Sequence, residues 1–364
     1  MNRLIIIGNG FDLAHGLKTS FYHFIEDYLN KAIISFYDSE THTYNDPLLE
    51  IKLTNNIKIS DKDKMARLLN PFNEMDKLNN SHHVQIKFKS KFFKIIYNKV
   101  TTIKWVDIEI EYFKLLVEAN NVKTNKIKHI INLNSSFKFL KDKLITYLEK
   151  QESEYNKEAI NTYNEYFTEI INVKQLYKVK QNEDNLRNGV SIHNLLFLNF
   201  NYTNIIENYL PKCNVDGSST IKYIHGNLNG DKGEPVFGFG DELDEDYKTF
   251  EKENIKELYQ NIKSFDYLQN NNYHSMINFL DEDNFQVQIF GHSCGLSDRT
   301  MLNEIFEHDN CKSIKIFYYE DDKGDNDFTE KTYEISKHFT DKKMLRKVVV
   351  PFKQSKPMPQ IKKD

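Results

Sequence analysis

Residues 3–20, RLIIIGNGFDLAHGLKTS, decide the fold. The aliphatic run at positions 4–7 has the length and composition of a strand buried on both faces of a parallel sheet. A glycine turn follows at once, and then a helical pattern. Because Gly8 and Gly10 have no side chains, their backbone can approach a phosphate closely, and the helix start offers unpaired N–H groups. Gly8, Asn9, Gly10 and Phe11 are therefore candidate nucleotide-binding residues.

The glycine spacing does not match a standard nucleotide motif. Gly8, Gly10 and Gly16 give GxG followed by five residues and a third glycine, which is neither the dinucleotide fingerprint nor a Walker A loop. A plain strand-to-helix turn explains the same residues, with Asp12 as a helix N-cap and His15 as a structural histidine. We carry Asp12 forward as a candidate catalytic residue and His15 as a candidate ligand contact.

Further short apolar runs occur at residues 195–198, 287–290 and 314–318, separated by helical stretches. This order predicts an α/β fold, with a Rossmann-like, doubly wound parallel sheet. No glycine lies between Leu17 and Asn188, which favours a large inserted helical lobe. We assign residues 1–19 and 190–350 to a discontinuous nucleotide-binding core and 20–189 to the lobe. Residues 37–83 are polar and predict a loop-rich insertion, and 351–364 predict a flexible tail.

Composition excludes several classes of protein. The 364 residues carry 49 Lys and Arg against 53 Asp and Glu, a formal charge of -4, so nucleic acid is an unlikely partner. No apolar run approaches the 18 residues of a membrane span, and the N-terminal run is too short for a secretory signal. We expect a cytoplasmic protein. The three cysteines lack metal-site or disulfide spacing and predict buried thiols.

Two polar islands follow predicted strands. The first, residues 198–204, LNFNYTN, contains Asn201, whose amide could orient a ribose hydroxyl or a water molecule. Alternatively, Asn201 or Thr203 caps the next helix. The second island ends in His225-Gly226. His225 could be a base or a ribose-binding imidazole, or a satisfied histidine at a bend that Gly226 supplies.

A third island, residues 289–298, reads IFGHSCGLSD. Gly291, His292 and Ser293 form a small-residue loop that could hold a phosphate or ribose, and Asp298 begins the following helix. The loop also resembles the GxSxG elbow of α/β-hydrolases. We discount that interpretation because no Asp and His at fitting strand ends follow the serine. Together with the first glycine turn, the three islands outline a nucleotide-sized cleft.

The acidic segment at residues 105–111, WVDIEIE, has two interpretations. On a helix, Asp107 and Glu111 would share a face and Glu109 would point away from Asp107. A solvated acidic face is the ordinary explanation. Alternatively, Asp107 or Glu109 is an additional acidic site residue, and paired carboxylates without histidine neighbours would suit Mg²⁺.

These motifs in combination resemble the bacteriophage abortive infection AbiH family. The resemblance covers residues 1 to about 320 and rests on positions 6–20, 105–109, 201–203, 225–226 and 291–298. The first motif is the specific one. More distantly, the order of the islands is similar to that of the SIR2-like domains of antiphage defence.

The SIR2-like resemblance implies a Rossmann-like fold that binds NAD and, in several members, hydrolyses it. It implies a glycine loop at residues 8–12, a ribose-contacting Asn201, the pair His225-Gly226 and a second loop at 291–293. One departure is that those domains often carry Asn-x-Asp, whereas this chain has Asn201-Tyr202-Thr203. The absent acid bears on chemistry at the nicotinamide pocket more than on nucleotide binding.

The function that this resemblance implies is antiphage abortive infection, with NAD as substrate or ligand and nicotinamide as the released product. Asn201, His225 and Asp12 are then the catalytic candidates. A nucleotide-binding sensor without turnover is a second hypothesis, and a nuclease using a divalent metal with Asp107, Glu109 and Asp12 is a third. A phage-derived trigger is expected, and the chain could assemble as a homo-oligomer.

Overall fold

The computed structural model describes residues 1–54, 70–103, 107–155, 160–179, 189–242 and 244–361. These residues form two compact units. The sheet unit contains Met1–Leu17, Leu148–Lys252 and Ile262–Asp364, and the helical unit contains Lys18–Tyr147 and Glu253–Asn261. The chain therefore enters the helical unit twice, the second time for the short segment Glu253–Asn261.

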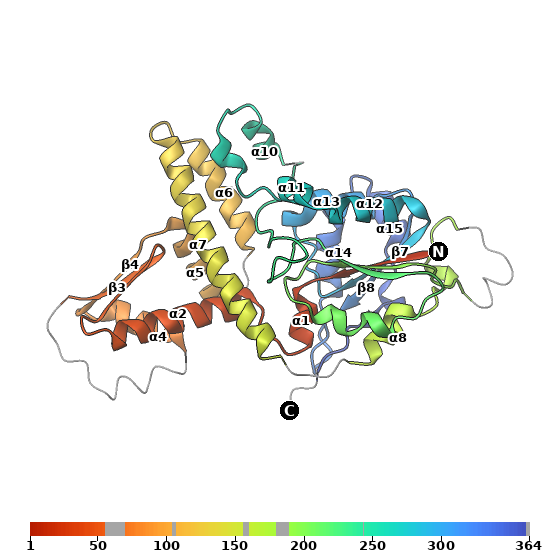
Figure 1. Ribbon diagram of the computed structural model, residues 1–364, viewed down its shortest axis with the longest axis horizontal. Helices are drawn as coiled ribbons and strands as arrows, with labels where there is room; N and C mark the ends of the chain where they lie inside the picture. Colours follow the sequence, from red (N-terminus) through yellow and green to blue (C-terminus); the bar gives the residue numbers. More distant parts are fainter. Residues whose placement is uncertain (55–69, 104–106, 156–159, 180–188, 243, 362–364) are drawn as a thin grey trace. The chain divides into compact units, whose positions relative to one another are not determined.

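The sheet unit is built on six parallel strands in the order β6-β5-β1-β7-β8-β9 (Figure 1). The strands are β1 (Asn2–Ile7), β5 (Leu195–Asn199), β6 (Ser219–Tyr223), β7 (Phe285–Phe290), β8 (Cys311–Tyr318) and β9 (Lys356–Pro357). The chain builds outward from β1 on one side and then on the other, which is the Rossmann-like strand order. The predicted α/β architecture with a parallel sheet is confirmed.

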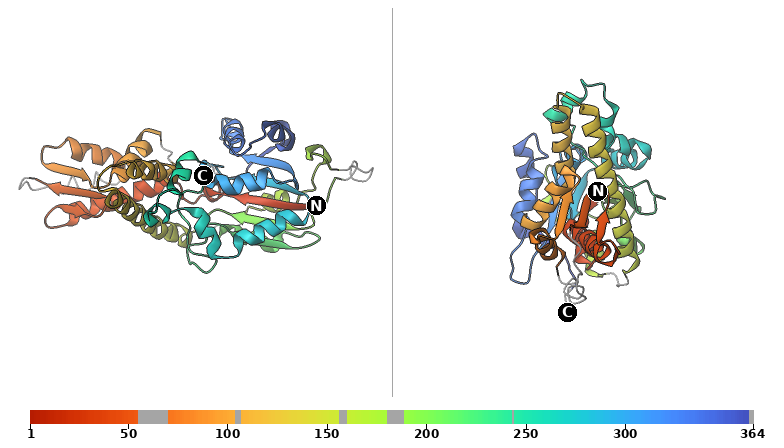
Figure 2. Two further views of the ribbon diagram at one scale, coloured as in Figure 1. Left: turned by 90° about the horizontal axis from the view of Figure 1, so that it is seen from above. Right: turned by 90° about the vertical axis from the view of Figure 1, so that its left-hand side faces the viewer.

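Helices pack on both faces of this sheet (Figure 2). Alternate residues of β1 supply the two cores: Leu4 and Ile6 face one, and Ile5 and Ile7 face the other. The first core is completed mainly by α12 (Asn272–Glu282), α13 (Arg299–Phe306), α14 (Phe328–Ser336) and α15 (Lys342–Val348). The second is completed by α1 (Asn9–Ala14), α8 (Thr162–Thr168) and the 3-10 helix Ile205–Asn208. The short helices α10 (Glu245–Phe250) and α11 (Lys263–Asp266) lie between β6 and α12 in the chain.

The C-terminal segment differs from the flexible tail that the sequence predicts. Lys356 and Pro357 pair with β8 as the sixth strand. Met358 is buried, and its N–H donates to the Tyr318 carbonyl at 2.7 Å. Ile361 N–H donates to the Ala14 carbonyl at 2.9 Å. The segment is polar in composition, but edge pairing satisfies its backbone and the sheet covers its one buried apolar side chain.

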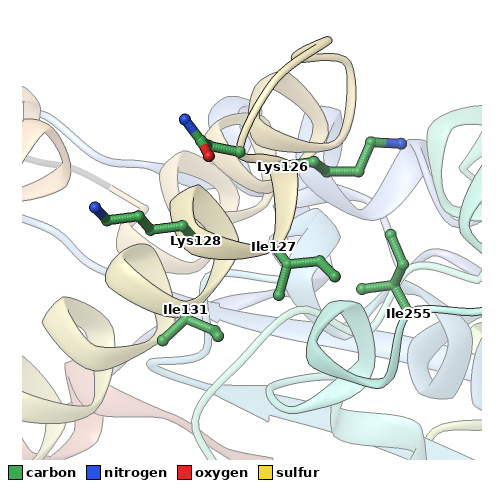
Figure 3. A pocket seen from close by; sticks show the side chains of 6 residues that line it. Lys126, Ile127, Lys128, Ile131 and Ile255 are labelled. Carbon is green, nitrogen blue, oxygen red and sulfur yellow. The ribbon is translucent and has the colours of Figure 1, made fainter.

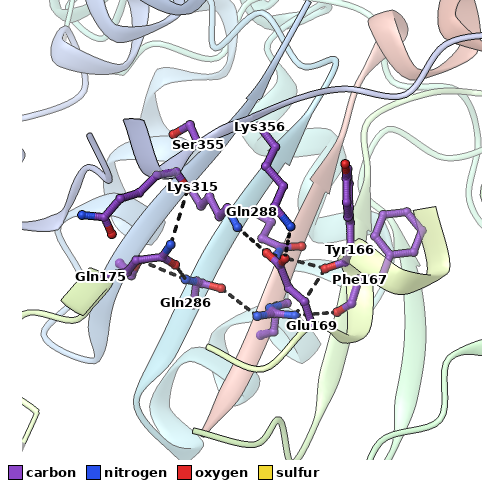
Figure 4. Close-up of polar contacts among 12 residues, drawn as sticks. Tyr166, Phe167, Glu169, Gln175, Gln286, Gln288, Lys315, Ser355 and Lys356 are labelled. Atoms are coloured by element: carbon purple, nitrogen blue, oxygen red, sulfur yellow. Dashed lines mark hydrogen bonds and ion pairs between the residues drawn. The ribbon is translucent and has the colours of Figure 1, made fainter. Parts of the chain in front are cut away.

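A buried polar network lies against the strands β1, β7, β8 and β9 (Figure 4). Glu169, which follows α8, forms ion pairs with Lys315 and with Lys356. Arg3 donates to Gln286 Oε1 at 2.9 Å and to the Phe167 carbonyl at 2.7 Å. The network thus joins the C-terminal strand and the end of α8 to the middle of the sheet.

In its described residues, the helical unit combines α-helices with a three-stranded antiparallel sheet, β2-β3-β4. The helices are α2 (Phe21–Asp38), α4 (Pro71–Asn80), α5 (Lys91–Ile103), α6 (Ile108–Asn120) and α7 (Lys126–Ser153), and the strands are β2 (Thr43–Asn45), β3 (Leu49–Leu53) and β4 (Val84–Phe88). The last turns of α7, from Leu148 onward, belong to the sheet unit. The prediction that residues 37–83 are loop-rich is wrong for the described part. Asp46 makes the turn between β2 and β3 by accepting from Leu48 and Leu49 N–H at 2.7 and 2.8 Å, and buried Leu49 and Ile51 anchor β3.

Two further sequence expectations can be checked. All three cysteines are buried free thiols, as predicted. None of the helices in the described part of the chain has the length and apolarity that crossing a membrane requires.

Candidate functional site

The N-terminal glycine turn and the third sequence island meet where the strand order reverses. Ile7, the last residue of β1, lies opposite the last residues of β5 and β7, so the loops that follow these strands are neighbours. Gly10 N–H donates to the Gly291 carbonyl at 2.8 Å. In doubly wound sheets, the reversal point at the carboxyl ends of the strands is where ligands bind.

Glycine is required here because the two loops touch. A Cβ atom on Gly10 would lie 2.7 Å from Gly291 Cα, and one on Gly8 would overlap His292 Cα. Gly291 itself has a φ of +68°, which disfavours any side chain. The glycines that the sequence predicts to approach a phosphate therefore also allow the two loops to pack closely. Asn9, Gly10 and Gly291 keep some solvent exposure.

The first island joins the N-terminal glycine turn through Asp12. Asn201 Nδ2 donates to Asp12 Oδ1 at 2.8 Å and to the Gly8 carbonyl at 3.1 Å. Thr203 Oγ1 donates to the other carboxyl oxygen, Asp12 Oδ2, at 2.7 Å. Asp12 lies inside α1, whose N-cap is Gly8, and the 3-10 helix after Thr203 is capped by Asn204. The capping interpretations of Asp12, Asn201 and Thr203 are therefore wrong.

These contacts fix the orientation of the Asn201 amide. Both of its hydrogen-bond partners are acceptors, so Nδ2 must face them and Oδ1 must face away. Among the residues that the structure describes, none donates to Asn201 Oδ1. The site therefore presents a carbonyl oxygen that can accept a hydrogen bond from a ligand hydroxyl or from water.

The pKa of the Asp12 carboxyl group lies well above its ordinary value. Burial raises the pKa of its carboxyl group from 3.8 to about 7, the nearby Glu152 raises it further, and the hydrogen bonds from Thr203 and Asn201 oppose the rise. Asp12 can consequently change its charge near neutral pH while both of its oxygens remain hydrogen-bonded.

His15 has a structural environment. Its Nδ1 donates to the Phe11 carbonyl at 2.6 Å, so its Nε2 accepts from the Tyr209 hydroxyl. The ring is fully buried and stacks on Tyr163. A ligand at the strand ends would not meet this imidazole, and we do not include it in the proposed site.

His225 belongs to a second polar cluster, built around Asp298. Asp298 Oδ1 accepts from Lys263 Nζ at 2.7 Å and lies 3.2 Å from His225 Nε2. The Tyr267 hydroxyl lies 3.3 Å from the same His225 nitrogen. Lys263 is fully buried. Burial and the Lys263 ammonium lower the pKa of His225, while the Asp298 carboxylate opposes them. His225 is therefore neutral at physiological pH and able to accept a proton.

His292 completes this cluster. Its Nδ1 accepts from Cys294 N–H at 3.0 Å, which leaves Nε2–H facing Asp298 Oδ2 at 3.7 Å. Burial lowers the pKa of His292 to about 3. The Phe200 ring lies against both imidazoles, with ring centroids 5.1 Å from His225 and 4.3 Å from His292. Phe200 thus bridges the Asp12 cluster, through the neighbouring Asn201, and the Asp298 cluster.

The structure brings together most of the residues that the sequence singled out. Four segments meet at the carboxyl edge of one sheet through the contacts described above; they carry Gly8–Asp12, Asn201, His225-Gly226 and Gly291–Asp298. Ser293 is exposed there. Asp107 and Glu109 lie in the helical unit, at the N-terminus of α6, where Asp107 Oδ1 accepts from Ile110 N–H at 3.1 Å. Trp105 lies outside the described residues.

Sequence reasoning missed two residues of the Asp298 cluster. Lys263 and Tyr267 come from a polar stretch, NIKSFDYLQ at residues 261–269, that contains no motif. The stretch gave no usable signal, because Lys263 and Tyr267 are buried whereas the more apolar Phe265 and Leu268 are exposed. In the described part of the chain, no group of three or more His, Cys, Asp or Glu side chains is arranged to hold a metal ion.

The model of one known protein family matches this chain over most of its length. The family described as bacteriophage abortive infection AbiH matches residues 4–320. The chain belongs to the AbiH family. Membership supports an antiphage abortive-infection role. A comparison with curated proteins gave no match.

Proposed function

We propose that this AbiH protein binds NAD at the carboxyl edge of its sheet and hydrolyses the N-glycosidic bond, releasing nicotinamide during phage infection. The observation that carries the proposal is Asn201 Oδ1, an acceptor that no described residue occupies, on the loop after β5. β5 is the neighbour of β1, next to the point where the strand order reverses between β1 and β7. A ribose presents hydroxyl donors to such an oxygen, and a dinucleotide has the length to span neighbouring strand ends.

The two loops give the diphosphate a place to lie. Asn9 is exposed, Gly10 and Gly291 are partly exposed, and Ser293 adds an exposed hydroxyl. The Gly10 N–H already donates to the Gly291 carbonyl, so the Ser293 hydroxyl is the donor that we assign to the phosphate oxygens. We assign the diphosphate to these loops and the nicotinamide ribose to Asn201.

Asp12 supplies the carboxyl group that this chain lacks two positions after Asn201. Where SIR2-like domains often carry Asn-x-Asp, this chain has Thr203, and its hydroxyl lies 2.7 Å from the Asp12 carboxylate. A carboxylate is thus available beside Asn201, contributed by α1. We assign Asp12 the task of fixing Asn201 and, when ionised, of stabilising the positive charge that develops on the ribose.

The proposed reaction needs no redox partner. The bond between ribose C1′ and the nicotinamide nitrogen breaks, and its electron pair neutralises the pyridinium ring. Water oriented by Asn201 Oδ1 attacks C1′ of the oxocarbenium-like ribose, and neutral His225 accepts the proton that this water loses. The products are nicotinamide, ADP-ribose and one proton, which the solvent receives when His225 is deprotonated again.

The test is nicotinamide release by the full chain from NAD, together with ADP-ribose binding by calorimetry. Asn201→Ala and His225→Ala should each lower nicotinamide release by about 10²-fold. Asn208→Ala and His274→Ala replace the same residue types at exposed positions and serve as matched controls. Full activity in both site variants would overturn the site assignment.

Calorimetry separates catalysis from binding alone. ADP-ribose binding that weakens in Asn201→Ala, without nicotinamide release by the wild type, would replace hydrolysis by the sensor function. Absence of both binding and release would contradict the proposal as a whole.

A further inference from the structure

The fully buried Lys263 lies just after the second entry of the chain into the helical unit. Asn261 is the last residue of that entry, and Ile262 returns to the sheet unit. Lys263 Nζ then reaches Asp298 Oδ1 at 2.7 Å. Asn261, in the helical unit, is therefore only two positions along the chain from Lys263, which forms the ion pair with Asp298 that faces His225.

The segment Glu253–Asn261 is firmly attached within the helical unit. Asn134 Nδ2 on α7 donates to the Glu257 carbonyl at 2.8 Å and to Gln260 Oε1 at 2.7 Å. Asn261 Nδ2 donates to the hydroxyl of buried Tyr112 at 3.0 Å. That hydroxyl donates in turn to Asn134 Oδ1 at 2.7 Å. One buried polar hub of α6 and α7 thus holds the last residues of the segment.

The outer part of the segment also lies along α7. Lys126 Nζ and Glu253 Oε1 are 3.3 Å apart. A groove between the segment and the start of α7 is lined by Asn125, Lys126, Ile127, Lys128, Ile131 and Ile255 (Figure 3). This groove leaves the outer contacts open to solvent, so the Tyr112–Asn134 hub is the principal attachment.

On the sheet side, backbone and side chain of Lys263 are both fixed. Lys263 N–H donates to the Phe239 carbonyl at 3.0 Å. Gly240 leaves room for the lysine stem, because a Cβ there would lie 3.4 Å from Lys263 Cβ and 2.8 Å from the Ser297 carbonyl oxygen. Ile262 also pairs with Phe239, so the sheet unit holds the backbone that places the ammonium group against Asp298.

We propose that Lys263 is a positioning residue of the site. Lys263 neutralises Asp298, and Asp298 in turn aligns His225. This inference rests on the proposed function for its catalytic consequence, but its effect on His225 can be measured without substrate.

The groups facing His225 determine the expected sign. Asp298 and Lys263 are its charged neighbours, Tyr267 contributes a hydroxyl, and His292 is neutral. Removing the Lys263 charge leaves the Asp298 carboxylate as the charged neighbour of His225, with no ammonium group to oppose it. The pKa of His225 should then rise in Lys263→Met.

The experiment follows His225 by NMR titration of its ring protons in the full chain. Lys263→Met should shift the titration midpoint upward and lower nicotinamide release by about 10²-fold. Because that variant buries an unpaired carboxylate and could fail to fold, Lys263→Met/Asp298→Asn removes both charges. This double variant should fold, give a midpoint below that of Lys263→Met, and remain impaired in nicotinamide release.

Two controls accompany this experiment. Gln260→Ala/Asn261→Ala removes contacts within the helical unit, and Lys128→Ala removes an exposed lysine; neither should shift the His225 midpoint. An unchanged midpoint in folded Lys263→Met would overturn the positioning role. If the midpoint moves as expected but the wild type releases no nicotinamide, only the proposed reaction fails.

Discussion

Two polar regions of the same sheet differ in where their groups lie. In the network of Figure 4, Lys315 and Lys356 share the Glu169 carboxylate, and the groups lie on strands and at the end of α8. At the carboxyl edge the groups lie mainly on the loops that follow the strands, and Asn201 Oδ1 has no donor among the described residues. Gln288 Oε1 in the first network also has no partner among the described residues. Neither buried charge nor an unused acceptor therefore identifies the site by itself, and position at the strand ends does.

The largest expected effect concerns Asp12 and pH. Because its folded pKa of about 7 exceeds 3.8, the folded state binds the proton more tightly, and this contribution to stability is lost as pH rises from about 4 to 7. The shift corresponds to about 4 kcal/mol. Asp12→Asn should therefore gain stability relative to the wild type as pH rises through this window, measured by urea unfolding at each pH.

The stability of Asp12→Asn must be compared with that of the wild type at each pH, because the titration of His292 changes stability in the opposite direction. Its pKa of about 3 means that stability rises with pH between about 3 and 6.5, so the wild-type curve sums opposing slopes. Asp12→Asn should also lower nicotinamide release, since Asn201 loses its carboxylate partner. A stability difference independent of pH would show that Asp12 is ionised throughout.

Glu169→Gln should have the next largest effect, on stability alone. It leaves the Lys315 and Lys356 ammonium groups without their carboxylate, and the cost of an unpaired buried charge is about 3 kcal/mol. Glu165→Gln, on the exposed side of α8, is the control. Nicotinamide release per folded molecule should be unchanged, and a selective loss of activity would remove the distinction between the two regions.

Gly10→Ala should cost about 2 kcal/mol of stability, because its new methyl group would crowd the Gly291 backbone. Gly324→Ala is a useful contrast. Gly324 has a φ of +87°, but no atom of the described residues lies within 4 Å of the place a Cβ would take, so only backbone strain of about 1 kcal/mol is expected. Thermal unfolding measures both. Equal costs would mean that loop contact contributes nothing.

Ser293→Ala should have the smallest effect. The side chain is exposed, so stability should change by less than about 0.5 kcal/mol. If Ser293 donates to the diphosphate, ADP-ribose affinity should fall by about fivefold, the value of one hydrogen bond. Calorimetry measures the affinity, and an unchanged value would remove Ser293 from the proposed site.

The sequence predicted those parts of the fold that depend on local pattern. The apolar run at residues 4–7 and the later runs identified the central parallel strands. The sixth strand was missed because Lys356 and Pro357 carry no strand pattern and pair only because β8 offers an edge. The small antiparallel sheet was missed although β3 and β4 alternate apolar and polar residues, because these short runs stand in a polar stretch and the turn at Asp46 contains no glycine.

For the candidate site, motifs gave the residue types but not their partners. Asn201, His225 and Asp12 follow strands, and that position could be predicted. The Thr203 contact with Asp12 could not, because it joins positions 191 residues apart. Lys263 was unpredictable for a different reason: a lysine in a polar stretch is ordinarily exposed, and the ion pair with Asp298 makes its burial tolerable.

A crystal structure of the full chain with ADP-ribose tests the central claim most directly. We expect a ribose hydroxyl within about 3 Å of Asn201 Oδ1, with the diphosphate against the loops of Gly10 and Gly291. Ligand bound elsewhere, with Asn201 Oδ1 turned to a donor of the protein, would contradict the proposed site.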